Sequence, residues 1–267
     1  MLLENKVAVV YGAGGAVGSA VARTFVREGA EVFLAGRTRA KLEQTAEAVE
    51  AAGRRARVAT VDALDEDDVD NHLESVLEAA GRVDISVNAV GFDNGEQGVA
   101  LTSLTADAYS QPIAEYTRTH FVTAKAAAGH MTARGHGVIL TVSNPMAQAP
   151  AALSGCFGQY GAAVENLTTQ LAAELGRDGV RALCLRPNGM PDSARDHDGA
   201  PGRMWRRAAQ RFGIGIDELL ETIGGGTLSG EPVTTEDVAE TAAFVASDRA
   251  KGLTGTVINV TGGAVAD

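Results

Sequence analysis

Short apolar runs alternate with longer amphipathic stretches along the whole chain. Residues 6–12, KVAVVYG, form a run rich in β-branched residues that ends at a glycine, which is typical of a buried strand. Residues 16–29 place apolar positions three and four apart and close on a glycine, which predicts an amphipathic helix. The two patterns recur and predict further strands over 31–37, 55–62, 83–91, 137–143, 180–187 and 254–263, and further helices over 39–53, 65–81, 112–134, 157–176 and 236–247.

This alternation predicts an α/β fold with a doubly wound parallel sheet of the Rossmann type, covered by helices on both faces. No linker, internal repeat or low-complexity tract interrupts it, so residues 1–267 are expected to form a single domain. The segment 188–230 departs from this alternation of strands and helices because it is rich in glycine, proline and charged residues. An insertion after the sixth strand lies at the carboxyl edge of such a sheet, where it is expected to cover a substrate.

The composition limits the partners of the chain. A formal net charge of −11 over 267 residues makes nucleic acid and anionic membrane surfaces unfavourable partners. No apolar run reaches the roughly 18 residues of a membrane span, and the N-terminus lacks the features of a signal peptide. Cys156 and Cys184 are too few for a disulfide framework or a metal cluster and are expected to be buried. We therefore expect a cytoplasmic protein without a metal centre, whose ligand is a small molecule.

Four glycines, Gly12, Gly14, Gly15 and Gly18, lie between the first predicted strand and the first predicted helix. Glycines let the backbone turn tightly and approach a pyrophosphate, which then accepts hydrogen bonds from N–H groups at the helix N-terminus. A glycine-rich turn without a ligand is the alternative. The strand–turn–helix context favours a dinucleotide cradle.

The end of the second strand indicates which dinucleotide is bound. Proteins that bind NAD place Asp or Glu there to hold the ribose hydroxyls. This chain has Gly36 and then Arg37, with Arg39 and Lys41 beyond. A guanidinium binds a 2′-phosphate that a carboxylate would repel, so NADP(H) is the expected cofactor. The alternative is that Arg37 is only a solvated loop charge.

Several motifs resemble those of the short-chain dehydrogenase/reductase family, and the resemblance covers essentially the whole chain. Residues 11–18, YGAGGAVG, are similar to the family's TGxxxGxG motif, and residues 88–91, NAVG, to its NNAG motif. Residues 187–189, PNG, stand in place of its PG motif, and residues 252–263 are similar to its closing strand. The resemblance implies a homotetramer and a cofactor site formed by Gly12, Gly14, Gly15, Val17, Gly18, Arg37, Asp62, Ala63, Asn88, Ala89, Val90, Pro187 and Gly189.

The catalytic positions of the family are changed. Aligned with the family's YGASKAAV motif, residues 157–164 put Phe157 at the catalytic tyrosine and Gly161 at the lysine. Asn144 falls at the catalytic serine, and Tyr116 falls near the helix asparagine. By resemblance the chain is therefore an atypical member that lacks the Tyr-x-x-x-Lys pair.

Ser143, Asn144 and Tyr160 are the residues that we expect to replace this pair. Tyr160 lies three residues after Phe157 on one helix, so its hydroxyl can enter the same cleft and donate a proton. Ser143 can donate to a substrate oxygen, and Asn144 can orient the substrate through its amide. The alternatives are a packing role for Tyr160 and a plain turn role for Asn144, which precedes a proline.

The remaining polar candidates carry weaker signals. Asp93 and Glu96 follow the fourth strand, where a substrate is expected, and they are either the nearest carboxylates or solvated loop charges. His120 is expected to be structural. The other histidines lie in charged or glycine-rich surroundings and are expected at the surface: His72, His130, His136 and His197.

The combined prediction is an NADP(H)-dependent oxidoreductase with a degenerate proton-transfer site. The segment 188–230 contributes Met204, Trp205 and Phe212, which predicts a small and largely apolar substrate. Because positioning alone promotes hydride transfer, a conjugated or already activated acceptor is favoured. Two other classes stay open: a non-redox lyase or isomerase that uses the cofactor structurally, and a nucleotide-binding sensor or partner protein.

Overall fold

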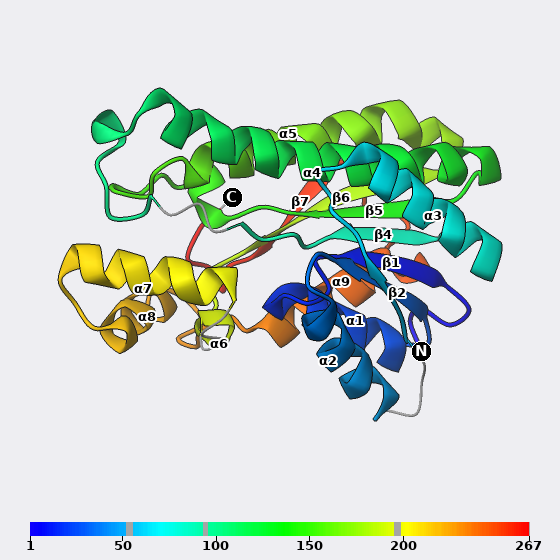
Figure 1. Cartoon of the computed structure of the whole chain (residues 1–267), viewed down its shortest axis with the longest axis horizontal. Helices are drawn as coiled ribbons and strands as arrows, with labels where there is room; N and C mark the ends of the chain where they lie inside the picture. The colour runs from blue at the N-terminus through cyan, green and yellow to red at the C-terminus, as the bar shows by residue number, and fades with distance from the viewer. Residues whose placement is uncertain (52–55, 93–95, 195–198, 267) are drawn as a thin grey trace.

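The protein, seen here in a computed structural model that describes residues 1–51, 56–92, 96–194 and 199–266, is built on one parallel sheet (Figure 1). The strand order is β3-β2-β1-β4-β5-β6-β7, and each neighbouring pair is parallel. The predicted doubly wound α/β fold is confirmed. The strands are β1 Val7–Tyr11, β2 Glu31–Gly36, β3 Ala56–Thr60, β4 Ile85–Asn88, β5 Gly137–Val142, β6 Val180–Pro187 and β7 Thr256–Val260.

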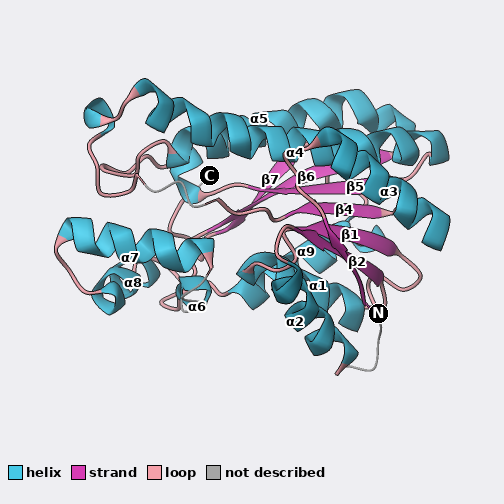
Figure 2. Cartoon of the chain, in the orientation of Figure 1, coloured by secondary structure: helices cyan, strands magenta, loops and turns pink. Residues whose placement is uncertain are grey.

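Helices cover both faces of this sheet (Figure 2). Ala8 and Val10 of β1 face the layer of α1, α2 and α9, whereas Val7 and Val9 face the layer of α3, α4 and α5. This alternation follows from the two-residue period of a strand buried on both faces. The helices are α1 Ala16–Arg27, α2 Arg39–Glu50, α3 Glu66–Ala80, α4 Ala106–Arg134, α5 Phe157–Leu175, α6 Pro191–Ala194, α7 Ala200–Phe212, α8 Ile216–Gly224 and α9 Thr235–Ala246.

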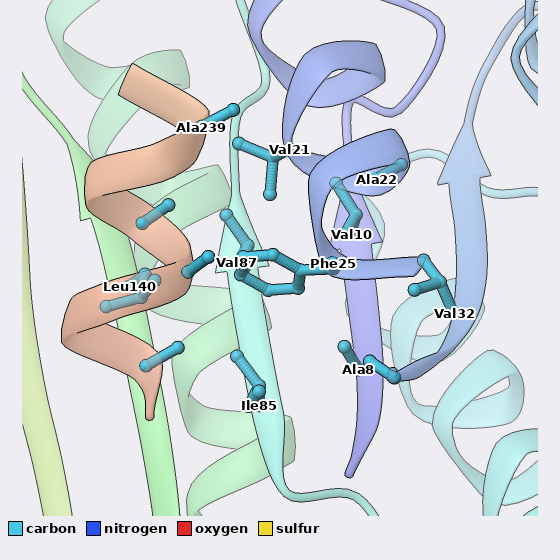
Figure 3. Close-up of a cluster of buried hydrophobic side chains, with 14 of the residues drawn as sticks. Ala8, Val10, Val21, Ala22, Phe25, Val32, Ile85, Val87, Leu140 and Ala239 are labelled. Atoms are coloured by element: carbon cyan, nitrogen blue, oxygen red, sulfur yellow. The ribbon is translucent and has the colours of Figure 1, made fainter. Parts of the chain in front are cut away.

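The first of these layers fixes the direction of α1. Phe25 of α1 is fully buried and lies over the sheet beside Val87 of β4 (Figure 3). Ala239 and Ala243 of α9 are also fully buried, and such small side chains let the α9 backbone approach α1 closely. The N-terminus of α1 is therefore held at the carboxyl edge of the sheet.

Helix α4 begins earlier than the predicted range of 112–134. It starts at Ala106, because the side chain of Thr105 accepts a hydrogen bond from the Ala108 N–H (3.1 Å) and caps the first turn. Pro112 then lies inside the helix rather than at its start. The predicted start was wrong because the cap at Thr105 lies outside the range that the apolar pattern marks.

The segment 188–230 folds into α6, α7 and α8, which gather at one end of the sheet (Figure 1). Ala208, Ala209 and Leu219 form a small buried cluster of their own there. Residues 195–198, which include His197, lie outside the described residues, as do Asp93 and the predicted boundary at residues 52–55. The segment thus forms a separate helical layer beside the carboxyl ends of the strands.

His72 corrects an expectation of a surface histidine. Its residue is only 6% exposed, and its ring packs edge-on against Tyr11 with ring centroids 5.8 Å apart. Leu73 and Val76 of the same helix are buried beside it. The residues that are charged and adjacent in sequence lie on the opposite face of α3. The composition around His72 therefore wrongly predicted a surface position for its side chain.

The outer surface bears on the predicted homotetramer. Phe121 of α4 and Phe244 of α9 are 50% and 43% exposed, and β7 forms an edge of the sheet. Exposed aromatic side chains are typical of surfaces that pack against another subunit, and the tetramer stays a prediction. Among the residues that the structure describes, no helix is both long and apolar enough to cross a membrane.

Candidate functional site

A cavity of about 390 Å³ lies at the carboxyl edge of the sheet, where the strand order reverses between β1 and β4. The loops that follow β1 to β6 line it, together with the N-terminus of α5 and with α7. In doubly wound sheets this reversal is where ligands bind. The predicted cradle, the predicted catalytic positions and the inserted segment therefore meet in one cavity.

The glycine cradle is tightly packed. Gly12 has a positive φ of 78°, and a Cβ there would come within 2.5 Å of the Ala89 carbonyl oxygen. A Cβ at Gly18 would come within 2.3 Å of the Gly12 carbonyl oxygen. No side chain caps α1, whose N-cap is Gly15, so its first N–H groups remain for an anion. A pyrophosphate fits these donors.

Most of the predicted cofactor residues line the cavity, and two support it from behind. Gly18 packs on Gly12. Asn88 donates from Nδ2 to Thr123 Oγ1 (3.0 Å) and accepts at Oδ1 from the Val90 N–H (3.0 Å), which fixes the end of β4. The predicted residues that line the cavity are Gly12, Gly14, Gly15, Val17, Arg37, Asp62, Ala63, Ala89, Val90, Pro187 and Gly189.

Positive charge marks the end of the cavity next to β2. Arg37 is exposed, and its guanidinium carbon lies 5.9 Å from the centroid of the Phe92 ring. Lys41 also lines the cavity. The nearby Arg39 is occupied instead by Glu43, to which its Nε donates at 2.8 Å. A guanidinium stacked on an aromatic ring keeps its planar donors available for a phosphate.

Aromatic side chains form the wall at the other end. The rings of Tyr116 and Tyr160 lie 4.3 Å apart between centroids, and Phe157 packs edge-on against Tyr160 at 5.1 Å. The Tyr116 hydroxyl donates to the Val142 carbonyl oxygen (2.8 Å), and burial raises the pKa of that phenol. Tyr116, which falls near the family's helix asparagine in the sequence, therefore closes the end of β5 and is not a proton donor for a ligand.

His120 lies behind this wall and is fully buried, with its ring 4.7 Å from that of Tyr116. Within the described residues neither ring nitrogen has a hydrogen-bond partner. Burial lowers its pKa to about 3 and that of His72 to about 4. His120 is structural in the sense expected from the sequence, because it packs in the apolar layer as a neutral ring.

This burial predicts acid sensitivity. The unfolded chain takes up protons below about pH 6.5 whereas the folded histidines stay neutral, so stability falls as the pH falls from about 6.5 towards their folded pKa values. Each histidine should contribute a slope of about 1.4 kcal/mol per pH unit over that window. Urea denaturation of the parent chain and of His120→Phe at pH 7 and pH 5 checks this. Equal pH dependence in the two proteins would contradict the assignment.

Asn144 is held by the chain on both sides of its amide. Its Nδ2 donates to the Phe157 carbonyl oxygen (2.9 Å), and its Oδ1 accepts from the Met146 N–H (3.1 Å). A Cβ on Gly161 would lie 2.5 Å from this Nδ2. Asn144 thus occupies the space that a side chain at Gly161 would need, so the residues at these two positions depend on each other.

Ser143 is connected by hydrogen bonds to two residues that the sequence did not indicate as site residues. Its Oγ donates to Oε1 of Glu165 on α5 (2.7 Å). Arg186 of β6 donates to the same carboxylate from Nε (2.8 Å) and from Nη2 (2.9 Å). Glu165 and Arg186 are far apart in sequence and carry no local motif, so only their complementary charges on a helix and a strand could have suggested the pair.

The inserted segment supplies the outer wall. Met204 and Trp205 of α7 line the cavity as expected, whereas Phe212 lies 40% exposed at the end of that helix. Glu96 forms an ion pair with Arg211 of α7 (3.6 Å). Helix α7 is therefore tied to the loop after β4 by charge and faces the cavity with apolar side chains.

Known proteins resemble this chain over nearly its whole length. Residues 12–265 match the family model described as Enoyl-(Acyl carrier protein) reductase. The chain is 32% identical to the 3alpha-hydroxysteroid dehydrogenase of Mediterraneibacter gnavus, over 99% of this chain and 98% of the relative. It is 27% identical to the 7alpha-hydroxysteroid dehydrogenase of Clostridium sardiniense, over 98% of this chain and 94% of the relative. A solved short-chain type dehydrogenase/reductase from Mycobacterium ulcerans matches with a TM-score of 0.82 and 26% identity, over 99% of this chain and 91% of that one.

Proposed function

This chain belongs to the short-chain dehydrogenase/reductase family, and we propose that it is an NADP(H)-dependent oxidoreductase acting on a small, largely apolar molecule. The proposal rests on the glycine cradle, which opens into the same cavity as the aromatic wall. A nicotinamide bound there supplies hydride transfer to or from a substrate carbon. The residues of the chain bind and orient the reactants and exclude water.

The proposed cofactor contacts follow the lining of the cavity. Gly12, Gly14, Gly15 and Val17 hold the pyrophosphate at the N-terminus of α1. Gly18 and Asn88 position the cradle and the end of β4 from behind. Arg37 would contact a 2′-phosphate and Asp62 the adenine, and the remaining proposed contacts line the same cavity: Ala63, Ala89, Val90, Pro187 and Gly189.

Arg37 should decide between the two dinucleotides. We expect NADPH to bind about tenfold or more tightly than NADH, because a charge-assisted hydrogen bond to the 2′-phosphate is made only by NADPH. In Arg37→Ala the ratio of the two dissociation constants should move towards one. Fluorescence titration of each reduced cofactor measures both constants directly.

Arg39→Ala is the matched control, because this neighbouring guanidinium is already paired with Glu43. It should leave the ratio of NADPH to NADH affinity close to that of the parent. Equal affinity of the parent chain for the two cofactors would remove the NADP(H) assignment.

The substrate side of the cavity supports an apolar ligand. Phe157, Tyr160, Met204 and Trp205 line it with aromatic and thioether surface. The names of two relatives, both hydroxysteroid dehydrogenases, agree with apolar molecules of this kind. We propose that residues 188–230 cover the bound substrate through α7.

Proton transfer in the proposed reaction lacks the family's tyrosine–lysine pair, since Phe157 and Gly161 stand at those positions. Tyr160 is the proposed proton donor, because its ring lines the cavity and stacks on Tyr116. Asn144 is proposed to orient the substrate through the edge of its fixed amide. Because Gly161 supplies no ammonium at the family's lysine position, the reaction favours activated acceptors.

The test is NADPH oxidation by the purified chain over ketones, imines and activated alkenes. Turnover that is faster for activated alkenes than for simple ketones supports the proposal. Conversion of a compound without net change in NADPH would instead show a lyase or isomerase. Tight NADPH binding with no turnover over the panel would show a sensor or partner protein.

A further inference from the structure

The Ser143 hydroxyl has one proton, and the structure shows where it points. Its Oγ lies 2.7 Å from Oε1 of Glu165, which is hydrogen-bond distance between a hydroxyl and a carboxylate. Ser143 is 4% exposed and lines the cavity at the end of β5. The direction of this single proton decides what Ser143 can offer to a ligand.

Glu165 is held as an acceptor. Arg186 grips the carboxylate with Nε on Oε1 and Nη2 on Oε2, and the two side chains are only 4% (Arg186) and 14% (Glu165) exposed. A guanidinium that donates to both oxygens of a carboxylate uses both of them as hydrogen-bond acceptors. The hydrogen between Ser143 and Glu165 must therefore come from Ser143.

The other groups near Ser143 do not reverse this arrangement. The Cys184 thiol contacts the Ser143 hydroxyl, but burial raises the pKa of this thiol to about 11, so it is neutral, and it donates to the Leu185 carbonyl oxygen (3.7 Å). The Tyr116 hydroxyl donates its hydrogen bond to the Val142 carbonyl oxygen. Ser143 therefore has no proton left for a ligand in the cavity, and only its oxygen lone pairs are left to meet one.

We propose that Ser143 is a fixed hydrogen-bond acceptor that selects ligands carrying a hydroxyl group over the corresponding carbonyl compounds. Glu165 and Arg186 are positioning residues that set this polarity. This changes the role expected of Ser143 from the sequence, which was that of a donor. The inference rests on the proposed function only in taking this cavity as the substrate site.

The physical cost of a mismatch gives the expected effect. A ligand hydroxyl donates to Ser143, whereas a ligand carbonyl oxygen at the same place would face another acceptor and lose its bond to water. An unsatisfied buried acceptor of this kind should weaken binding about tenfold. Alcohols should therefore bind more tightly than ketones of the same skeleton.

Trp205 provides a direct readout, because it is the single tryptophan of the sequence and lines the cavity. Its fluorescence is titrated with matched apolar pairs: cyclohexanol with cyclohexanone, borneol with camphor, and menthol with menthone. We expect the alcohol of each pair to bind about tenfold more tightly to the parent chain. In Ser143→Ala this preference should fall to about twofold or less, since the acceptor is gone.

A double variant tests the two positioning residues by removing their opposite charges together. Glu165→Gln with Arg186→Met removes both charges and keeps a polar partner for Ser143. Because an amide can donate as well as accept, the Ser143 proton becomes free to turn, and the preference for alcohols should fall to about twofold or less. A purely structural role would lower both affinities together and leave their ratio unchanged.

Glu66→Gln with Lys125→Met is the matched control, since it removes an exposed ion pair outside the cavity. It should keep the full preference. The proposal is overturned if the parent binds ketones as tightly as alcohols, if no alcohol of the panel binds, or if Ser143→Ala retains the preference. An NADPH titration of the same samples separates the cases: cofactor binding without alcohol preference removes this inference alone, whereas alcohol preference without cofactor binding removes the proposed function alone.

Discussion

The triple variant Phe157→Tyr, Gly161→Lys and Asn144→Ser is expected to reduce simple ketones about 10²–10⁴-fold faster than the parent chain, with NADPH as the reductant. It restores a phenol at the cavity wall together with an ammonium nearby. The ammonium favours the ionised phenol and so makes it a better proton donor to a forming alkoxide. This is the largest effect on activity that the structure predicts.

The Asn144→Ser substitution is added to Phe157→Tyr and Gly161→Lys because of a contact in the structure. A Cβ at Gly161 would lie 2.5 Å from Nδ2 and 3.1 Å from Cγ of Asn144. The Asn144 side chain cannot turn away without losing its hydrogen bonds to Phe157 and Met146. Serine removes the amide nitrogen and keeps an oxygen that can accept from the Met146 N–H.

Whether Asn144 blocks a side chain at position 161 is tested by comparing the triple variant with the double variant Phe157→Tyr with Gly161→Lys. NADPH oxidation with cyclohexanone measures activity, and urea denaturation measures stability. The double variant should be destabilised and only weakly active, because the new side chain displaces Asn144. Equal activity of the two variants would show that the contact between positions 144 and 161 is easily relieved.

Gly18→Ala should lower the free energy of unfolding by about 2–3 kcal/mol and impair NADPH binding. The added Cβ would lie 2.3 Å from the oxygen and 2.7 Å from the carbonyl carbon of Gly12, and 2.9 Å from the Cα of Ala13. All three contacts are backbone atoms, so no side chain can move to relieve them. The cradle itself must shift, and with it the donors that face the pyrophosphate.

Gly129→Ala serves as the control for the same chemical change. Gly129 is an exposed position within α4, and a Cβ there would meet nothing within 4 Å. This substitution should stabilise the chain by about 0.5–1 kcal/mol, because alanine favours a helix over glycine. Urea denaturation and NADPH titration of both variants check the pair. A Gly18→Ala protein as stable as the parent would refute the close packing of the cradle.

The fold could be predicted from local patterns because each helix and strand carries its characteristic pattern within a few consecutive residues. The run at Val7–Tyr11 is buried on both faces and ends at a glycine, and the strand follows it closely. The same patterns fail where the boundary signal lies apart from the periodic run. The predicted range of 112–134 missed the first turns of α4, which is capped by Thr105. His72 lies among charged residues in the sequence, but its side chain lies on the buried side of α3.

The site was only partly predictable, because its decisive contacts join residues that are distant in sequence. Gly12, Gly14 and Gly15 follow a motif and line the cavity, as does Arg37, whereas Gly18 packs behind them. Ser143 is 22 residues from Glu165, and Glu165 is 21 residues from Arg186. No local pattern links a helix carboxylate to a strand guanidinium, so the polarity of Ser143 is a property of the folded chain alone.

The contact between Asn144 and Gly161 also limits the order in which these two residues can be substituted during evolution. A lysine that arose at position 161 while Asn144 remained would put its Cβ 2.5 Å from an amide nitrogen, and selection for folding would remove it. A serine that arose first at position 144 would open the space but restore no proton donor, so selection for activity would not keep it. A sequence that carries Asn144 and Gly161 can therefore reach a lysine at position 161 only through an intermediate that folds poorly or gains no activity. The two positions are thus expected to be epistatic, so that each constrains which substitutions the other accepts.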